Sequence, residues 1–332
     1  MKHGLPLVTL YLTERCNSRC ITCDYWRHGR RDATLASVQN LLPDLEALGT
    51  RTALISGGEP LLNPEWPAIA ETLRSRGVQL WLLTSGLSLA KHAARAVPLF
   101  ESITVSLDGT CAQTYAAIRG VDAFDKVCEG IRAAAQRGAN VGLRVTLQRA
   151  NYRELPRFVS LARELGASAV SFLAVDVANP HAFARNDDFS RGLALEADDL
   201  AVLDGVLDAL EREHAADFAS GFILESPARL RRLRDYFAAV AGLGAFPPVR
   251  CNAPEFSAVV GVDGAVSPCF FIPGPAGAPG STLAARLADA PMVELRRAIR
   301  AGERRECQRC VCSMYREPDE LTFGLRSAGV QH

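Results

Sequence analysis

The sequence has no excess of charge of either sign, and this absence narrows the possible function classes. Lysine and arginine together number 37 among the 332 residues, and aspartate and glutamate also number 37. A protein that holds nucleic acid through its phosphates usually carries a strongly basic balance. Nucleic acid is therefore not expected as a partner. The length suffices for one large barrel or for two ordinary domains with a core of the usual size.

Long hydrophobic runs are also missing. The first four residues lead directly into a strand-like stretch without the apolar core of a signal peptide, and no later run reaches the roughly 20 residues of a membrane-spanning helix. No internal repeat or heptad pattern is present. These absences predict a soluble, cytoplasmic protein with no membrane partner, and they exclude a repeat array or a coiled coil.

Cysteine, in contrast, is abundant, because the chain has ten of them. Eight fall into an early group and a late group, which comprise Cys16, Cys20, Cys23 and Cys251, Cys269, Cys307, Cys310, Cys312. In a reducing cytosol, clustered cysteines indicate metal or iron–sulfur ligation rather than disulfides. The isolated Cys111 and Cys128 are expected to be small buried hydrophobic residues.

From residue 7 to about 175, short β-rich runs alternate with longer amphipathic stretches, which is typical of a parallel sheet with crossover helices. The strands are predicted at Val8 to Thr13, Thr52 to Ser56, Gln79 to Thr84, Ser102 to Leu107, Val141 to Leu147 and Ala169 to Leu173. Helices are predicted at Phe124 to Arg137 and Leu155 to Leu165. The pattern predicts an α/β fold with a partial (β/α)6 TIM barrel.

The pattern changes after residue 178. A polar loop precedes two helical stretches, Leu200 to Glu213 and Ala228 to Val240, and a predicted hairpin from Ala258 to Ser267 turns at Asp263-Gly264. We therefore expect a barrel over residues 1–200, a helical bridge over 201–250, and a small cysteine-ligated domain over 251–332.

The early cysteines have a spacing that suggests a catalytic cluster. Three thiolates cannot complete a four-iron cluster, which normally takes four, so one iron stays open. An open metal position distinguishes a catalytic site from a closed structural one. The loop follows the first strand, and in a parallel barrel it would stand at the carboxyl-terminal face, where active sites form.

The segment from Leu12 to Cys23, which contains this CxxxCxxC spacing, resembles the cluster loop of radical S-adenosylmethionine (radical SAM) enzymes. Gly57-Gly58-Glu59, after the second strand, is similar to the GGE motif of that family, which holds the amino group of SAM. Paired glycines allow close approach of the backbone to a ligand, and a carboxylate complements an ammonium group. A tight turn is the simpler interpretation of the glycine pair.

Further matches lie at the ends of later strands. The resemblance implies SAM contacts at Thr84 and Ser85, at Ser106 and Asp108, and at Arg144, whose guanidinium can hold the SAM carboxylate with two hydrogen bonds. An arginine that caps the core is an alternative for Arg144. Arg119-Gly120 fits the subgroup with added iron–sulfur domains.

The sequence departs from the family pattern at Thr22, where an aromatic residue is usual. Tyr25 or Trp26 could instead pack on the adenine, or both could be ordinary core or surface aromatics.

The late cysteines resemble a twitch domain, a short form of the SPASM domain with one auxiliary cluster. The resemblance implies a second 4Fe-4S cluster at Cys251, Cys269, Cys307 and Cys310. Cys312 is left over, and it could replace Cys310 as a ligand or act as a free thiol near the substrate. A four-thiolate zinc site is the structural alternative.

The resemblance implies that SAM binds the open iron and is cleaved to methionine and a 5′-deoxyadenosyl radical, which removes a hydrogen atom from the substrate. An external reductase such as flavodoxin or ferredoxin would supply the electron. We favour a net oxidation of a small molecule or peptide, as in a biosynthetic oxidoreductase. The alternatives are a redox-neutral epimerase that uses Cys312 as hydrogen donor, and a non-enzymatic iron–sulfur or zinc carrier protein.

The identity of the substrate does not follow from these motifs. Many peptide-modifying relatives carry an N-terminal leader-binding module, and the early first strand argues for a small metabolite or an externally presented peptide. Four polar residues after the last predicted strand of the barrel could line a substrate pocket, although a solvated surface position is favoured for each, and these are Asp176, Asn179, His181 and Glu225.

Overall fold

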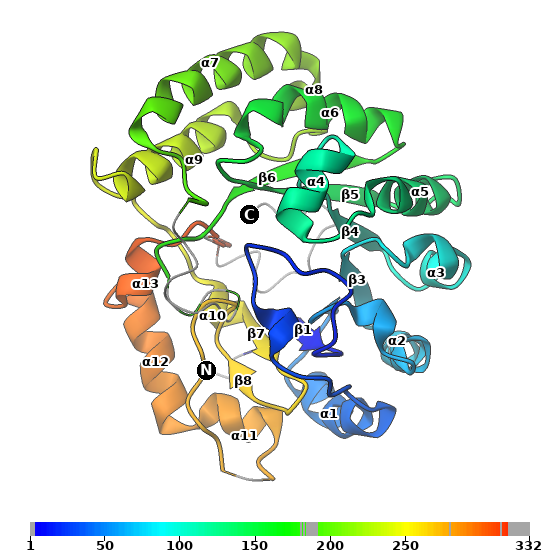
Figure 1. Ribbon diagram of the computed structural model, residues 1–332. Helices are drawn as coiled ribbons and strands as arrows, with labels where there is room; N and C mark the ends of the chain where they lie inside the picture. The colour runs from blue at the N-terminus through cyan, green and yellow to red at the C-terminus, as the bar shows by residue number, and fades with distance from the viewer. Residues whose placement is uncertain are drawn as a thin grey trace.

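The computed structural model describes residues 4–179, 181, 183, 192–278, 280–312 and 314–317. Its centre is an eight-stranded, mostly parallel sheet with the strand order β6-β5-β4-β3-β2-β1-β7-β8 (Figure 1). The parallel strands are β1 (Leu7–Tyr11), β2 (Thr52–Ser56), β3 (Gln79–Thr84), β4 (Ser102–Ser106), β5 (Val141–Leu147), β6 (Ala169–Ala174) and β7 (Ser257–Val260). Only the short β8 (Val266–Ser267) runs antiparallel, and it pairs with β7.

Helices follow the strands in alternation and cover one face of the sheet (Figure 1). They are α1 (Leu35–Ala47), α2 (Trp66–Ser75), α3 (Leu89–Ala96), α4 (Ala112–Arg119), α5 (Phe124–Ala135) and α6 (Leu155–Glu164), with short 3₁₀ turns at Tyr25–Arg27, Pro60–Leu62 and Tyr152–Glu154. Because side chains alternate along a strand, one set from each strand packs under these helices. On β5 this set includes Val141, Leu143 and Val145, all fully buried.

The opposite side chains of each strand point to the face that α1, α2, α3, α5 and α6 leave uncovered, which we call the inner face. At its amino-terminal end a small apolar cluster closes this face. Leu7, Leu54 and Trp81 from three neighbouring strands pack there with Phe256 and Met314 from the C-terminal part of the chain. Farther along β5, Arg144 and Thr146 alternate with the helix-facing residues and lie on the inner face.

The C-terminal half adds to both edges of the sheet. Next to β6 lie α7 (Ala197–Glu213), α8 (Ala215–Ala219) and α9 (Pro227–Val240), and an extended segment places Ile223 beside Val170 in a parallel bridge. Beyond β1, the chain forms α10 (Ala253–Phe256), α11 (Leu283–Ala288), α12 (Ala290–Arg300) and α13 (Arg305–Gln308) around the β7–β8 hairpin. Since β7 pairs in parallel with β1, this hairpin extends the main sheet.

The predicted strands and helices agree with the structure, apart from their ends. The first strand ends at Tyr11 rather than Thr13, because Leu12 and Thr13 turn away to bond with Ala33 and Asp32. The hairpin turn at Asp263-Gly264 is confirmed, and Gly264 has a φ of 77° that favours glycine. The polar loop after residue 178 and the end of the C-terminal segment lie partly outside the described residues. The predicted partial barrel and the three-part division of the chain stay predictions.

The two isolated cysteines behave differently. Cys128 is a buried residue of α5, as expected. The expectation for Cys111 is wrong, because this residue is exposed and directly precedes α4. It occupies the N-cap position of that helix, where small polar residues are preferred, and its sulfur lies 3.5 Å from the hydroxyl of Thr114.

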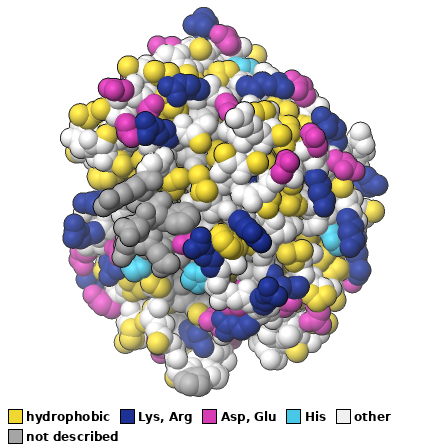
Figure 2. Space-filling view, viewed as in Figure 1, with side chains coloured by type: hydrophobic (Ala, Val, Ile, Leu, Met, Phe, Trp, Pro, Cys, Tyr) yellow, Lys and Arg dark blue, Asp and Glu magenta, His cyan; other side chains and the backbone are white. Residues whose placement is uncertain are grey.

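The surface seen in Figure 2 carries basic and acidic side chains interspersed around its edge, in keeping with the balanced composition. None of the helices in the described part of the chain is both long and apolar enough to cross a bilayer.

Phe256 tests the packing of the inner apolar cluster. We expect Phe256→Ala to lower the free energy of unfolding by about 3–5 kcal/mol, because the ring is fully buried and its loss leaves a cavity. Val293→Ala, on the exposed side of α12, should change it by less than about 0.5 kcal/mol. Urea unfolding of the metal-free protein measures both, and equal effects would show that the cluster contributes little.

Candidate cluster and cofactor site

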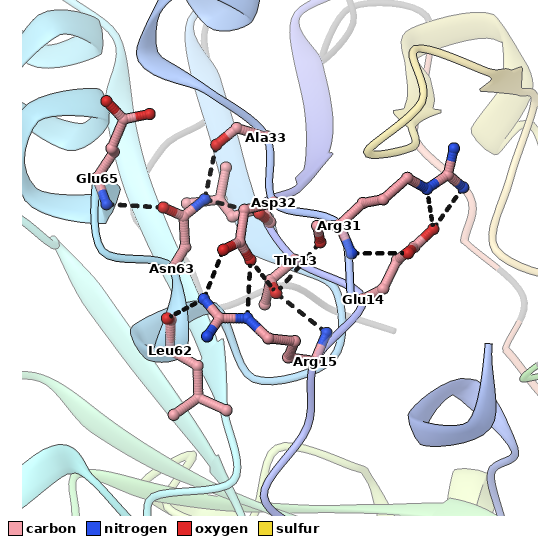
Figure 3. A network of polar contacts seen from close by, with 10 residues as sticks. Thr13, Glu14, Arg15, Arg31, Asp32, Ala33, Leu62, Asn63 and Glu65 are labelled. Atoms are coloured by element: carbon pink, nitrogen blue, oxygen red, sulfur yellow. Dashed lines mark hydrogen bonds and ion pairs between the residues drawn. The ribbon is translucent and has the colours of Figure 1, made fainter. Parts of the chain in front are cut away.

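The loop that carries Cys16, Cys20 and Cys23 crosses the carboxyl ends of the parallel strands, and a polar network holds its base (Figure 3). Asp32 accepts hydrogen bonds from the Thr13 hydroxyl at 2.5 Å and from Arg15 Nε at 3.1 Å. Asn63 Nδ2 donates to the carbonyl groups of Leu12 at 2.7 Å and of Ala33 at 2.8 Å. These contacts join the two ends of the loop to the turn after β2.

The glycine pair after β2 lies directly against this loop. The Gly58 N–H donates to the Thr13 carbonyl, and the Glu59 N–H donates to the Arg15 carbonyl, each at 2.8 Å. A Cβ on Gly58 would lie 2.2 Å from the Arg15 carbonyl oxygen, and Gly57 has a φ of 123°. Glycine is therefore required here for the close approach of two backbone segments, which is more than a tight turn needs.

Glu59 is fully buried, and its carboxylate is occupied by protein donors. Its oxygens accept hydrogen bonds from the Thr84 hydroxyl at 2.8 Å, from the Ser85 hydroxyl at 2.6 Å and from the Ser85 N–H at 2.7 Å. The Leu61 N–H adds a fourth bond at 3.2 Å. The carboxylate thus ties the ends of β2 and β3 together, and the Ser85 hydroxyl also lies 3.0 Å from Asn17 Oδ1 in the cysteine loop.

The C-terminal end of α4 contacts the loop from the other side. The Arg19 and Ile21 N–H groups donate to the carbonyls of Arg119 and Ile118 at 2.9 and 3.0 Å. The Arg119 guanidinium forms an ion pair with Asp108 at 3.0 Å, and only 11% of the Arg119 side chain and 2% of the Asp108 side chain are exposed. Asp108 also accepts from the Thr146 N–H at 2.7 Å, so it links β4, β5 and α4.

The three thiols of the loop lie close enough to influence one another. The pKa of Cys16 is raised to about 11 and that of Cys23 to about 12, mainly by burial, with a smaller contribution from neighbouring thiols of the same loop. Arg119 acts in the opposite direction on all three thiols. Burial alone would lower the pKa of Arg119, but Cys20 and Asp108 outweigh this effect, and the guanidinium stays charged.

Three clustered, shielded thiols with a nearby cation are a suitable donor set for an iron–sulfur cluster, because metal binding displaces the thiol protons. In the backbone near them, the Tyr25 N–H lies 3.4 Å from the Cys23 sulfur. The ring of Tyr25 meets Tyr11 edge-on at 5.4 Å, while Arg27 covers the Trp26 ring. The proposed adenine contact of Tyr25 or Trp26 stays a prediction.

Arg144 lies apart from these residues, toward β6. It stands in register with Ser106 on β4, and its Nε donates to the Ser171 hydroxyl at 2.6 Å. Burial lowers the pKa of Arg144, whereas Glu225 and Cys312 raise it. The structure therefore brings the cysteine loop, Gly57 to Glu59, Thr84, Ser85 and Asp108 into direct contact, and it places Arg144 nearer to the late cysteines.

The late cysteines line one cavity. Its wall contains Cys251, Cys269, Cys307, Cys310 and Cys312 together with apolar residues such as Phe271 and Ile272. Asn252 organises this region, because its side chain exchanges two hydrogen bonds with the backbone of Arg316 at 2.7 and 2.9 Å. That contact brings the chain end back to Cys251. The described residues contain no group of three or more His, Cys, Asp or Glu side chains that could hold a single metal ion.

Cys312 differs from the other late cysteines in its surroundings. Burial raises its pKa to about 12, and Arg144 on the inner face and Arg229 on α9 act against this rise. Glu225 belongs to the same charged group, because both arginines influence its carboxylate, and it accepts the Phe172 N–H at 2.9 Å. Cys312 is thus the late thiol whose neighbours include the inner face of the sheet.

The expected surface position is wrong for three of the four polar residues that could line a substrate pocket. At most 5% of Asp176, Asn179 and Glu225 is exposed, because each side chain bonds to the backbone inside the protein. Asp176 caps the turn that follows β6, and Asn179 Nδ2 donates to the Phe271 carbonyl at 3.1 Å. Glu225 caps the edge of β6. His181 retains a largely exposed side chain near Glu306.

Sequence patterns do not identify several residues that build the site. The Arg119-Gly120 motif does not indicate that the Arg119 side chain lies beside the cysteines. Asp32, Asn63 and Asn252 hold loops through contacts between distant segments. For Asn63 the sequence contains only a turn signal, which is the Asn63-Pro64 dipeptide.

Residues 10–162 match the model of the radical SAM superfamily. These residues form a radical SAM domain. The match includes the cysteine loop and the strand ends that surround it.

Two curated relatives extend the match. The chain is 27% identical to "Fe-coproporphyrin III synthase" of Methanosarcina barkeri and 30% identical to "Pre-heme d1 synthase" of Dinoroseobacter shibae. Each match covers 65% of this chain, and 54% and 55% of the respective relatives. The chain therefore spans about half the length of the curated relatives it matches.

Solved structures agree in fold. SuiB from Streptococcus suis bound to S-adenosylmethionine superposes with a TM-score of 0.67 at 13% identity, over 98% of this chain and 77% of that one. SuiB bound to the precursor peptide SuiA gives a TM-score of 0.64 at 14% identity, over 90% of this chain and 67% of that one. At this level of identity the likeness shows the fold alone, an α/β fold with a mostly parallel sheet.

The ion pair between Asp108 and Arg119 yields a stability prediction. Asp108→Asn leaves the Arg119 guanidinium without its counter-charge, so we expect the free energy of unfolding of the metal-free protein to fall by about 3–5 kcal/mol. Glu164→Gln breaks an exposed pair with Arg157 and serves as the control, for which we expect a much smaller change. Urea unfolding that shows similar losses in both variants would contradict this description of the pair.

Glu225 yields a pH prediction. Burial raises its pKa from 4.5 to about 7, so its contribution to stability is complete below about pH 4.5 and is lost as the pH rises through about 7. In Glu225→Gln this loss is absent. The variant should therefore gain stability over the wild type between about pH 5 and about pH 8, by on the order of 1–3 kcal/mol. Urea unfolding at both pH values measures the difference, and a constant offset between the proteins would refute it.

Proposed function

We propose that the protein is a radical SAM enzyme with a catalytic 4Fe-4S cluster at Cys16, Cys20 and Cys23, and that it performs a net oxidation of a small molecule or peptide. The main support is that the cysteine loop lies against the ends of β2, β3 and β4, and that the same part of the chain matches the radical SAM superfamily model. When bound, the cluster supplies the electron that cleaves SAM to methionine and a 5′-deoxyadenosyl radical.

The residues of the chain have distinct roles in this proposal. Glu59 positions the strand ends, because its carboxylate already accepts four hydrogen bonds, and the backbone of Gly57-Gly58 offers the approach for the SAM amino group. Thr84 and Ser85 would contact the ribose of SAM, and Arg144, the register partner of Ser106, would hold its carboxylate. Asp108 acts through Arg119, which it holds beside the thiols.

The second part of the proposal is an auxiliary 4Fe-4S cluster at Cys251, Cys269, Cys307 and Cys310. Its support is the cavity that all five late cysteines line. Four thiolates complete such a cluster, and a complete cluster suits electron transfer rather than substrate binding. An electron passed from the substrate radical to this cluster makes the net reaction an oxidation.

The relatives indicate two substrate classes. The two curated relatives are named for the synthesis of an iron porphyrin and a haem precursor, and SuiB was solved with a peptide. Either a small molecule or a peptide is therefore compatible with this domain. An external one-electron reductase such as flavodoxin or ferredoxin completes the cycle.

An epimerase is the second candidate function, and the position of Cys312 favours it. This thiol is influenced by Arg144 on the inner face, where a substrate radical would form. A hydrogen atom returned from Cys312 would make the reaction redox-neutral. A carrier protein without catalytic activity gives no reason for the glycine pair against the cysteine loop.

Iron counting and product analysis test the catalytic cluster. After anaerobic reconstitution we expect about eight irons in the wild type and about four in the Cys16→Ala/Cys20→Ala/Cys23→Ala variant, with 5′-deoxyadenosine formed from SAM and dithionite by the wild type alone. Cys128→Ala, which removes a buried cysteine outside both groups, should retain the iron content. A fully loaded wild type that forms no 5′-deoxyadenosine would exclude the radical function.

Single cysteine variants decide between the two roles of Cys312. If Cys310 is the fourth ligand, Cys310→Ala loses about four irons, whereas Cys312→Ala retains about eight. In an epimerase, Cys312→Ala would also lose the transfer of deuterium from solvent to product. The opposite iron counts would assign Cys312 as the ligand and remove the hydrogen-donor role.

A further inference from the structure

Two adjoining cavities on the outside of the C-terminal segment are strongly basic. The larger, of about 650 Å³, is lined by Arg250, Arg300 and Glu255 among others, and the smaller, of about 40 Å³, by Arg229, Arg232 and Arg309. Both share Phe246 and Pro247 in their walls. We call the five arginines together the outer basic surface. It contrasts with the formal charge of zero of the whole chain.

The few acidic groups near this surface do not balance it. Arg300 pairs with Glu255 at 3.1 Å, and Arg250 pairs with Glu317 at 3.3 Å. Glu255 is the single acidic residue in the described walls of the two cavities. Glu225 also influences Arg229, so the five arginines face three carboxylates. Aromatic rings lie among them, because Arg250 stacks on Tyr315 and Arg309 covers Phe246.

The outer basic surface lies directly over the late cysteines. Cys251 and Cys307 form part of the wall of the larger cavity, and Cys310 forms part of the wall of the smaller one. The same three cysteines line the cavity that contains Cys269 and Cys312. Cys251, Cys307 and Cys310 thus border both this surface and the cavity of Cys312, whose neighbours include Arg144 on the inner face.

We propose that the outer basic surface docks an acidic one-electron carrier protein, which accepts the electron that the auxiliary cluster receives from the substrate. This inference rests on the proposed function. In the step, one electron passes from the reduced auxiliary cluster to the oxidised carrier, no bond forms or breaks, and no proton moves. Opposite charge on two protein faces steers their encounter and fixes their orientation.

The position of the surface explains why the carrier docks there. The two outer cavities share wall residues with the cavity of the auxiliary site, and these include Cys251, Cys307 and Cys310. A carrier on this surface would reach the cluster without entering the space above the cysteine loop, where SAM and substrate bind. Electron exit and substrate binding therefore use different faces of the molecule.

The test uses the full, anaerobically reconstituted protein and a purified acidic flavodoxin as the probe. At about 20 mM salt we expect Arg232→Gln/Arg250→Gln/Arg309→Gln to reduce the association rate constant by about tenfold or more, and about 300 mM salt should abolish most of the difference. Reoxidation of the dithionite-reduced auxiliary cluster by oxidised flavodoxin, followed by stopped-flow absorbance, should slow by a similar factor.

A matched triple variant controls for net charge. Arg95→Gln/Arg157→Gln/Arg212→Gln removes three exposed arginines from α3, α6 and α7, each of which is paired with a glutamate. It should leave the association rate within about twofold of the wild type. Equal losses in both triple variants, or no loss in either, would overturn the proposal. Tighter binding of inorganic phosphate or of a single-stranded oligonucleotide than of flavodoxin would also overturn it.

The failure of this inference can be distinguished from failure of the proposed function. SAM cleavage with dithionite needs no carrier, so 5′-deoxyadenosine formation by the wild type with unchanged flavodoxin association in the first triple variant refutes the docking surface alone. If flavodoxin association depends on the outer basic surface but the wild type cleaves no SAM, the proposed function and the proposed electron transfer are refuted. The outer basic surface then still binds the carrier.

Discussion

The close contact between the cysteine loop and the glycine pair after β2 determines the arrangement of the rest of the site. Gly57 and Gly58 carry no side chain that would separate the two backbones, so the loop carbonyls of Thr13 and Arg15 can bond to the segment that ends at Glu59. Glu59 then binds the end of β3 through Thr84 and Ser85. A Cβ at Gly58 would displace the loop and with it the three thiols.

The charge of Arg119 is the second element on which the site depends. A cluster of thiols in a buried loop is costly to ionise, and a single guanidinium, held by Asp108, reduces that cost for all three cysteines. The late cysteines have a comparable arrangement, since Arg144 and Arg229 favour the thiolate form of Cys312. Each group of cysteines therefore has its own basic partner from a neighbouring element.

Much of the fold could be predicted from the sequence, because the repeated alternation of short apolar strands and amphipathic helices leaves few topologies. β2, β3 and β5 have the predicted bounds. The pairing of β7 with β1 could not be predicted, since two strands about 250 residues apart meet at an edge that local patterns do not specify. Spacing identified the cysteines, but the burial of Glu225 and Asn179 depends on tertiary contacts that lie outside any local signal.

The central claim is that SAM binds at the open iron beside Cys16, Cys20 and Cys23. Electron–nuclear double resonance tests it most directly, with SAM labelled with ¹⁵N at its amino group and a Cys251→Ala/Cys269→Ala/Cys307→Ala variant that removes three of the late cysteines and keeps the early group intact. The account predicts a hyperfine coupling between the reduced cluster and the labelled nitrogen. A reduced cluster that shows no such coupling while SAM is bound would contradict it.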